Sequence, residues 1–228
     1  MASRIALEVC RAISLAYFKP AHGVRYRGQK NIPEAGPVIV APNHSTYYDA
    51  ILVATGIKRR VRTMAWDALF RVPLLGPSIR WFGAFPVDAE SYDAQAYKQC
   101  LRILLRGGAL VIFPEGRRTM GTELAPFEPG VARLALRTGA LIVPTTITGA
   151  FEAFPRWRKC PRPRWRIIVK FHRPIAPPKN VHLRGEELRQ TVEALTEAII
   201  RSIRRRYAAH LRLQRRRGRP LPAPPASS

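Results

Sequence analysis

Three short, uninterrupted apolar segments do most to restrict how this chain folds. They cover residues 38–41, 109–113 and 141–143, and each has the length and composition of a strand that is buried on both faces. A helical pattern over residues 128–138 separates the last two segments and stops at Gly139. Strands that alternate with helices across short glycine-containing joints predict an α/β fold, a single domain with a largely parallel central sheet flanked by helices.

An amphipathic helix is predicted at the N-terminus, over residues 1–22. Ile5, Val9, Ile13 and Tyr17 recur there at helical spacing, and the charged residues fall off that stripe. Two interpretations are open. Either the helix docks on the domain, or its apolar stripe lies in the interface of a membrane.

The same periodicities predict two more helices and a further strand. Ser91 is the expected N-cap of a helix that stops at Gly107 and Gly108. Residues 166–171 alternate as a strand, and a long amphipathic helix is expected from residue 186 to about residue 207. The apolar faces are Tyr97, Cys100, Leu101, Leu104 and Leu105 in the first helix, and Leu188, Val192, Leu195 and Ile199 in the second.

The chain is therefore expected to have three parts. Residues 1–22 form the N-terminal helix, and residues 23–207 form the folded domain. Residues 208–228 are rich in arginine and proline and have little apolar surface to bury, which predicts a basic, disordered tail.

The charge balance predicts an anionic partner. The chain of 228 residues has 39 lysine and arginine residues against 15 acidic residues, a formal net charge of +24. Nucleic acid, an anionic membrane surface and an acidic carrier protein all suit such a surplus. The apolar content of 46% is typical of a globular protein and excludes a disordered basic chain.

Cysteine spacing and the length of apolar runs bear on the location of the protein. Cys10, Cys100 and Cys160 are far apart and form neither a zinc-binding pattern nor a disulfide framework, so we expect free thiols and no metal. No apolar run approaches the ~20 residues of a membrane span. Glu8 and Arg11 interrupt what would be the core of a signal peptide. We expect the protein to be made in the cytoplasm and to stay there.

A histidine and an aspartate follow the first predicted strand. In residues 43–49, Thr46 and Asp49 match a capping box, whose acidic side chain reaches back toward the residues before the helix. His44 lies there, so the carboxylate can hold the imidazole in one tautomer and leave its other nitrogen free as a general base. The alternative is that Asp49 only caps the helix and His44 is an ordinary hydrogen-bonded loop residue.

A second polar segment, residues 113–119, follows another predicted strand. Gly116 allows a ligand to approach the backbone closely, and Arg117 and Arg118 are suited to gripping a phosphate through paired hydrogen bonds. Glu115 can orient a substrate hydroxyl or pair with one of the arginines. Parallel sheets carry their chemistry just past the carboxyl ends of their strands, where both segments are expected. Taken alone, this segment also fits a solvated turn.

Together the two segments resemble a known family, the glycerolipid acyltransferases, and in particular the 1-acylglycerol-3-phosphate (lysophosphatidate) acyltransferase type. The resemblance spans roughly residues 25–175, with blocks at 28–33, 41–49, 83–88, 113–119, 127–136 and 142–144 in family order. The His-x4-Asp pattern alone is weak. With Phe-Pro-Glu-Gly about 70 residues later, the match becomes specific.

The resemblance implies an enzyme and assigns roles to its residues. His44 would remove the proton of the acceptor hydroxyl, Asp49 would orient His44, and Pro144 would belong to the acyl-donor side. The acceptor-binding block falls on Glu115, Gly116, Arg117, Arg118 and Thr119. The implied reaction moves a fatty acyl group from acyl-CoA or acyl carrier protein to the hydroxyl of a lysophospholipid, without a metal or bound cofactor.

Three positions depart from the family pattern. Ala89 stands where the second block usually ends in an arginine, Trp66 replaces a common lysine, and His172 replaces a frequent glycine. The first two departures remove cations close to the acceptor. Lysophosphatidate remains the expected acceptor, in phospholipid biosynthesis, and the alternative is another lyso-lipid or lipid alcohol without a phosphomonoester.

A different class of function also fits the charge. Residues 156–173 carry eight cations and no acid around Trp157 and Trp165, a composition suited to phosphate contact and base stacking. The chain would then be a basic binding protein on a degenerate acyltransferase scaffold. No zinc finger, RNA-recognition signature or basic zipper accompanies the segment. We therefore expect peripheral binding to an anionic membrane surface, at the cytoplasmic face of the cell membrane, and do not expect nucleic acid as a partner.

Overall fold

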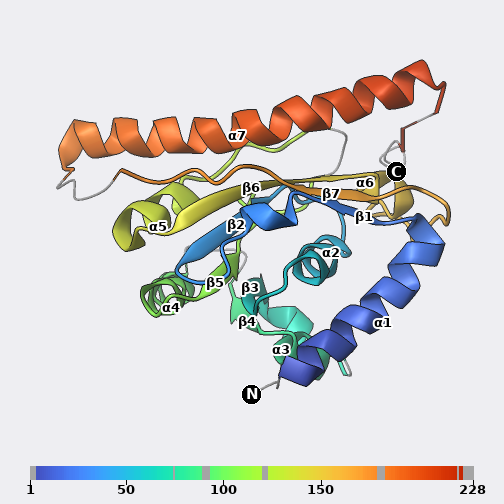
Figure 1. Ribbon diagram of the computed structural model, residues 1–228, viewed down its shortest axis with the longest axis horizontal. Helices are drawn as coiled ribbons and strands as arrows, with labels where there is room; N and C mark the ends of the chain where they lie inside the picture. The colour runs from blue at the N-terminus through green and yellow to red at the C-terminus, as the bar shows by residue number, and fades with distance from the viewer. Residues whose placement is uncertain are drawn as a thin grey trace.

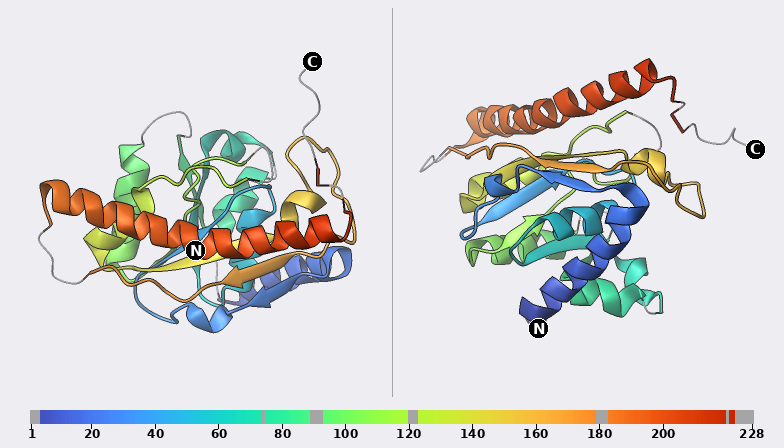
Figure 2. Two further views of the ribbon diagram at one scale, coloured as in Figure 1. Left: turned by 90° about the horizontal axis from the view of Figure 1, so that it is seen from above. Right: turned by 45° about the vertical axis from the view of Figure 1, so that its right-hand side comes forward.

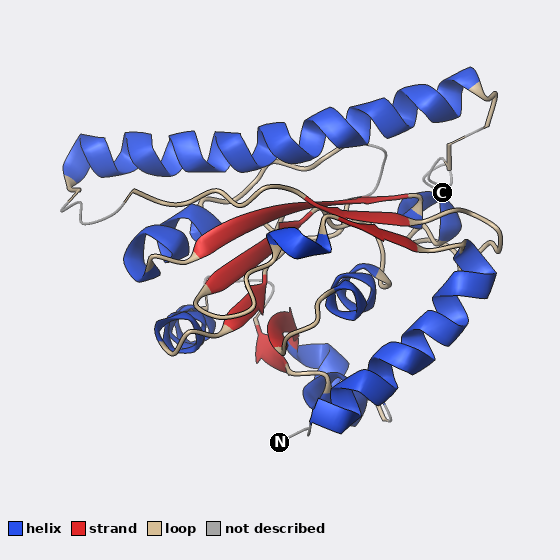
Figure 3. Cartoon of the chain, viewed as in Figure 1, coloured by secondary structure: helices blue, strands red, loops and turns tan. Residues whose placement is uncertain are grey.

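The computed structural model describes residues 4–73, 75–88, 93–119, 123–178, 183–219 and 221–222. These residues form a seven-stranded sheet with the strand order β1-β7-β6-β2-β5-β3-β4. Neighbouring strands run parallel except β6 and β7, which are antiparallel. The predicted α/β fold with a largely parallel sheet flanked by helices is confirmed (Figure 1, Figure 3).

The strands and helices follow one another along the chain in the alternation that the sequence predicts. The strands are β1 (Arg25–Arg27), β2 (Val38–Pro42), β3 (Val61–Trp66), β4 (Ala84–Val87), β5 (Ala109–Val111), β6 (Leu141–Thr148) and β7 (Ile168–Phe171). The helices are α1 (Arg4–His22), α2 (Asp49–Gly56), α3 (Leu75–Trp81), α4 (Ala94–Leu105), α5 (Gly130–Thr138), α6 (Ala150–Ala153) and α7 (Gly185–Arg216), with 3-10 turns η1 (Gln29–Asn31) and η2 (Asp67–Arg71).

The central strands of the sheet are buried on both faces. Side chains alternate between the two sides along each strand, and helices cover each side. Val38 and Val40 of β2 point into a core shared with α1 and α2. Ile39, between them, points into a second core shared with α4, α5 and α7. Figure 2 shows α7 lying across one side of the sheet, with α1 and α2 on the other. The three continuous apolar segments thus become β2, β5 and the start of β6, at the centre of the sheet.

The N-terminal helix docks on the domain, but not through its predicted stripe. Among the described side chains of α1, the buried ones are Cys10, Ser14, Phe18 and His22. The stripe is exposed instead, with exposed fractions of 75% for Ile5, 48% for Val9, 65% for Ile13 and 44% for Tyr17, although the hydroxyl of Tyr17 also contacts that of Tyr48 at 2.8 Å. Within the described ranges, no helix is long and apolar enough to cross a bilayer.

Two predicted helix starts differ from the structure. Ser91, the expected N-cap of α4, lies outside the described residues, and Asp93 caps the helix instead. Its carboxylate accepts hydrogen bonds from the backbone of Gln95 at 2.9 Å and of Ala96 at 2.8 Å. Helix α5 begins at Gly130, two residues later than expected, because Pro129 precedes it as the N-cap.

The predicted end of the last helix at residue 207 is wrong, and so is the predicted disorder of residues 208–216. Helix α7 continues to Arg216. Nε2 of His210 lies 2.5 Å from Oε1 of Glu152, which is almost fully buried in α6, and Tyr207 and Gln214 are also buried. Residues 208–216 therefore belong to the folded domain. Residues 223–228 lie outside the described part of the chain.

Candidate active site

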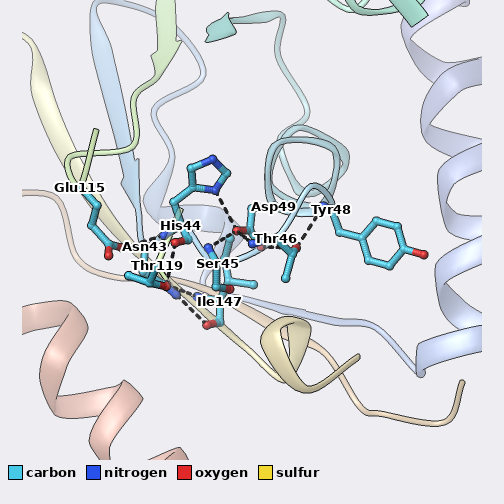
Figure 4. A network of polar contacts seen from close by, with 9 residues as sticks. All are labelled: Asn43, His44, Ser45, Thr46, Tyr48, Asp49, Glu115, Thr119 and Ile147. Carbon is cyan, nitrogen blue, oxygen red and sulfur yellow. Dashed lines mark hydrogen bonds and ion pairs between the residues drawn. The ribbon is translucent and has the colours of Figure 1, made fainter. Parts of the chain in front are cut away.

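His44 and Asp49 lie side by side where β2 ends and α2 begins. Nδ1 of His44 is 2.9 Å from Oδ2 of Asp49, whose side chain is completely buried (Figure 4). The predicted contact between the two residues is confirmed. It results from local chain geometry: Asp49 is the first residue of α2, and its side chain turns back along the loop that carries His44.

The carboxylate of Asp49 is held by backbone and side-chain donors. Oδ2 accepts hydrogen bonds from the backbone N–H of Ser45 at 2.6 Å and of Thr46 at 2.7 Å, and Oδ1 accepts one from the hydroxyl of Thr46 at 3.0 Å. The reach of Asp49 back to Thr46 is that of the predicted capping box. The helix nevertheless begins later than that box implies, with Tyr48 as its N-cap instead of Thr46.

The imidazole of His44 is fixed on one side and accessible on the other. Its ring stacks on Phe113, with 4.0 Å between the ring centroids, and its side chain is 20% exposed. Because Asp49 is a carboxylate acceptor, Nδ1 carries the proton that it shares with Asp49, and Nε2 is left as an acceptor. Nε2 points away from Asp49 (Figure 4), and His44 lines the main cleft of the protein.

The backbone of His44 is clamped by two residues of the second polar segment. Its N–H donates to Oε1 of Glu115 at 2.7 Å, and its carbonyl oxygen accepts from the backbone N–H of Thr119 at 2.9 Å and from the hydroxyl of Thr119 at 3.1 Å. Oε2 of Glu115 accepts from the N–H of Ala125 at 2.8 Å. Among the described side chains, no arginine pairs with this carboxylate, and Glu115 is almost fully buried. Acceptor binding by Glu115 and Thr119 stays a prediction, and their contacts are those of residues that position His44.

Asn43 is a positioning residue for which the sequence alone predicted no role. Its amide nitrogen donates to the carbonyl oxygen of Ile147 at 3.1 Å, and its amide oxygen accepts from the N–H of Ile147 at 2.7 Å. This pair of bonds ties the loop that carries His44 to β6. An asparagine directly after a strand is equally common in an ordinary turn, so its spacing alone gave no signal.

A cleft of about 1950 Å³ opens in front of His44. Ligand pockets in proteins are typically about 300–1000 Å³, so this cleft has room for more than one substrate. Apolar residues also line the cleft, among them Trp66, the residue that replaces a common lysine of the family. The basic residues that line the cleft are Arg117, Arg118, Arg133, Arg137, Arg156 and Arg189.

Gly116, Arg117 and Arg118 are the members of the predicted acceptor block that reach the cleft. Gly116 has a φ of +65°, which glycine adopts at little steric cost. The guanidinium of Arg118 lies 3.7 Å from the ring centroid of Tyr47, a cation–π contact that holds it near His44. Arg117 is exposed. The guanidinium groups of Arg117 and Arg118 are thus placed where they are suited to binding an anion in the cleft.

The other predicted positions lie away from the reacting groups or outside the description. Pro144 is buried within β6 opposite Ala41 and does not line the cleft, so its link to the acyl donor stays a prediction. Ala89 lies outside the described residues. The ring of His172 is hydrogen-bonded to the hydroxyl of Thr146 at 2.7 Å, and burial lowers the pKa of His172 to about 4. Among the described residues, no group of three or more His, Cys, Asp or Glu is placed to hold a metal.

The buried carboxyl of Glu115 is expected to make stability depend on pH. Burial raises the pKa of Glu115 from 4.5 to about 7, against the opposing effect of its two backbone hydrogen bonds. The folded state therefore binds more protons than the unfolded state between pH 4.5 and 7, so this group stabilises the fold at low pH and loses that contribution as pH rises through 7.

Comparison with Glu115→Gln isolates this effect, because glutamine does not titrate. Between pH 5 and pH 8, the free energy of unfolding of the wild type should fall by roughly 2 kcal/mol relative to the variant. Urea denaturation at the two pH values measures the difference. The same difference at both values would show that the carboxyl of Glu115 titrates normally.

Comparisons with known proteins agree with the fold and indicate a family. A family model described as Acyltransferase matches residues 23–148. A chloroplastic 1-acyl-sn-glycerol-3-phosphate acyltransferase of Arabidopsis thaliana is 24% identical, over 77% of this chain and 50% of that protein. The Bacillus subtilis protein of the same activity is 27% identical, over 80% of this chain and 87% of that protein.

A solved structure has the same fold. The crystal structure of a 1-acyl-sn-glycerophosphate acyltransferase from Thermotoga maritima aligns with a TM-score of 0.69 and 24% identity, covering 87% of this chain and 82% of that one. The chain spans about half the length of the chloroplastic and algal relatives that it matches.

Proposed function

Because this chain belongs to the acyltransferase family, we propose that it transfers a fatty acyl group from an acyl thioester to the free hydroxyl of 1-acylglycerol-3-phosphate. The product is phosphatidate, for phospholipid biosynthesis. The observation that carries the proposal is the pair of His44 and Asp49, whose free imidazole nitrogen faces a cleft lined by arginines. The names of the relatives from Arabidopsis thaliana and Bacillus subtilis support the choice of acceptor.

The geometry supports direct transfer between two bound substrates. Nε2 of His44 takes the proton of the acceptor hydroxyl as its oxygen attacks the thioester carbonyl carbon. The carboxylate of Asp49, 2.9 Å from Nδ1, stabilises the imidazolium that forms. The tetrahedral intermediate then expels the thiolate, which takes a proton from His44. Every step uses groups of this chain and its two substrates.

Recognition of the acceptor falls to Arg117 and Arg118. A phosphomonoester carries close to two negative charges at neutral pH and calls for several charge-assisted hydrogen bonds. Both arginines line the cleft that contains His44. Trp66 lines it too and is half exposed, which favours the second candidate: an acceptor with a smaller or masked charge, such as a lysophospholipid diester or another lipid alcohol.

An assay with labelled acyl-CoA and a panel of lyso-lipids tests the proposed reaction. We expect phosphatidate as the main product, with a clear preference for lysophosphatidate over lysophosphatidylethanolamine. The opposite preference would establish the second candidate. Absence of thioester release with every acceptor and with both acyl-CoA and acyl carrier protein would instead indicate a binding protein on an acyltransferase scaffold.

We also propose that the protein acts as a peripheral enzyme on an anionic membrane surface, at the cytoplasmic face of the cell membrane. The stripe of Ile5, Val9, Ile13 and Tyr17 is exposed along α1 while the opposite side of the helix packs on the domain. Such a helix lies in a lipid interface with its apolar face buried. The formal net charge of +24 adds attraction to anionic lipid, on the order of 1 kcal/mol for each cation near the surface.

Removing two apolar side chains from the stripe should weaken membrane binding. Ile5→Ser with Ile13→Ser is expected to lower the partition coefficient onto vesicles of anionic lipid by at least about a hundredfold, because burying each side chain contributes about 1.5–3 kcal/mol. Co-sedimentation with vesicles measures the change. Binding of the wild type should also weaken as salt rises, since exposed charges are screened over about 8 Å at physiological ionic strength.

A matched control uses exposed leucines elsewhere on the surface. Leu105 at the end of α4 and Leu213 near the end of α7 are exposed, and Leu105→Ser with Leu213→Ser removes a similar apolar area. This control should bind vesicles as the wild type does. Equal losses in the two double variants would mean that α1 has no special part in docking.

A further inference from the structure

Beyond the loop of residues 113–119, the cleft continues along α5 toward α7. The loop and the helix are joined by a hydrogen bond of 2.7 Å from the N–H of Glu128 to the carbonyl oxygen of Pro114. Gly130, Arg133 and Arg137 of α5 all line the cleft. At 1.5 Å per helical residue, the two arginines lie about 5 and 10 Å further along the axis than Gly130. Figure 1 and Figure 2 show α5 beside the N-terminal half of α7.

Arg133 and Arg137 are cations without a protein partner. Both are exposed, and in the described part of the chain neither forms an ion pair, a side-chain hydrogen bond or a ring contact. Like charges four residues apart destabilise a helix slightly, so their placement is explained by neither helix stability nor local pairing. Arg189, across the cleft on α7, differs because Glu186 and Glu193 pair with it.

An apolar surface adjoins the two arginines. Leu136 of α5 and Leu188 and Val192 of α7 line the same part of the cleft. Leu188 is 39% exposed and is one of the large exposed apolar side chains of the protein. An apolar surface beside two cations suits a ligand that combines an aromatic base with phosphate groups.

We propose that this part of the cleft binds the adenosine 3′,5′-bisphosphate end of an acyl-CoA donor. The phosphates contact Arg133 and Arg137, and the adenine ring packs on Leu136 and Leu188. The thioester lies at the far end of the extended pantetheine arm, which leads along the start of α5 to His44. The proposal rests on the proposed acyl transfer and selects coenzyme A as the carrier, because the arm of acyl carrier protein has one phosphodiester and no base.

Binding of adenosine 3′,5′-bisphosphate to the full-length protein tests the site without turnover. Isothermal titration calorimetry should show that this nucleotide binds the wild type, and that Arg133→Ala with Arg137→Ala weakens the affinity at least tenfold through loss of charge-assisted bonds. The matched control is Arg201→Ala with Arg205→Ala, an exposed pair four residues apart on α7 that does not line the cleft. It removes the same charge and should bind the nucleotide within twofold of the wild type.

Donor preference provides the second readout. We expect the ratio of kcat/KM for palmitoyl-CoA to kcat/KM for a short thioester without a nucleotide to fall at least tenfold in the Arg133 and Arg137 variant. The KM for lysophosphatidate should stay unchanged in both double variants. Turnover of the short thioester reports on acyl transfer itself, and nucleotide binding reports on the site, so failure of one is distinguishable from failure of the other.

Three results would overturn the proposal. The first is no binding of adenosine 3′,5′-bisphosphate to the wild type. The second is an equal loss of affinity in the two double variants, which would show an effect of overall charge. The third is turnover of acyl carrier protein thioesters but not of acyl-CoA, which would assign this surface to a carrier protein.

Discussion

Replacing His44 with alanine is expected to lower turnover by roughly 10²- to 10⁴-fold, the usual contribution of a positioned general base. The imidazole is the group whose free nitrogen faces the cleft, and Asp49 holds it in the tautomer that leaves this nitrogen unprotonated. Steady-state rates with acyl-CoA and lysophosphatidate measure the loss.

The fold should survive this substitution. Asp49 loses one hydrogen-bond partner but keeps the donors of Ser45 and Thr46, so no buried charge is left unsatisfied. His44→Asn provides the matched variant, because its amide can still donate toward Asp49 but has no basic nitrogen. Both variants should be comparably inactive with unchanged circular dichroism. A near-normal rate in either of them would refute the assignment of His44 as the base.

The centre of the sheet was predictable from the sequence, and its edges were not. Strands β2, β5 and the start of β6 are buried on both faces, so their sequences are continuously apolar. Strand β1 at one edge reads Arg-Tyr-Arg and is only partly buried. Strands β3 and β4 at the other edge are also partly exposed, and neither gives a clear period of two. Tertiary pairing defines these strands more than their own composition does.

The end of α7 shows how composition can hide a periodicity. Residues 208–228 are rich in arginine and proline, and that composition suggested a disordered tail. Ile199, Ile203 and Tyr207 nevertheless recur every four residues and face the core, and His210 follows them to pair with Glu152. Long arginine side chains occupy the solvent face of the same helix, so the local average is polar although one face is buried.

The contact between His44 and Asp49 was predictable because it is local, whereas the contacts that support it were not. His44 and Asp49 are five residues apart, within reach of one capping motif. Glu115 and Thr119 contact the backbone of His44 from 71 and 75 residues further along the chain. A sequence shows that such residues belong together but not which atoms meet. The family resemblance implies acceptor binding for both residues, which stays a prediction, and the structure adds that they hold the backbone of His44.

Replacing Asp49 with alanine is expected to abolish almost as much turnover as replacing His44, because the two residues act as a unit. The variant should also be less stable. It leaves the N–H groups of Ser45 and Thr46 buried without acceptors, and each unsatisfied donor costs about 1–3 kcal/mol. Rates and urea denaturation together measure the two effects, and the double variant with His44→Ala should be little slower than His44→Ala alone.

Asp49→Asn separates the charge of Asp49 from its hydrogen bonds. Two backbone N–H groups, at 2.6 and 2.7 Å, point at Oδ2, so the amide oxygen of asparagine should take that position and its NH₂ group should turn toward the hydroxyl of Thr46. The tautomer of His44 is then preserved, and the loss is the negative charge that stabilises the imidazolium. A charge-assisted hydrogen bond contributes about 1.5–3 kcal/mol, so turnover should fall roughly ten- to a hundredfold while stability changes little. Wild-type turnover in Asp49→Asn would show that Asp49 acts only as a helix cap and a structural acceptor.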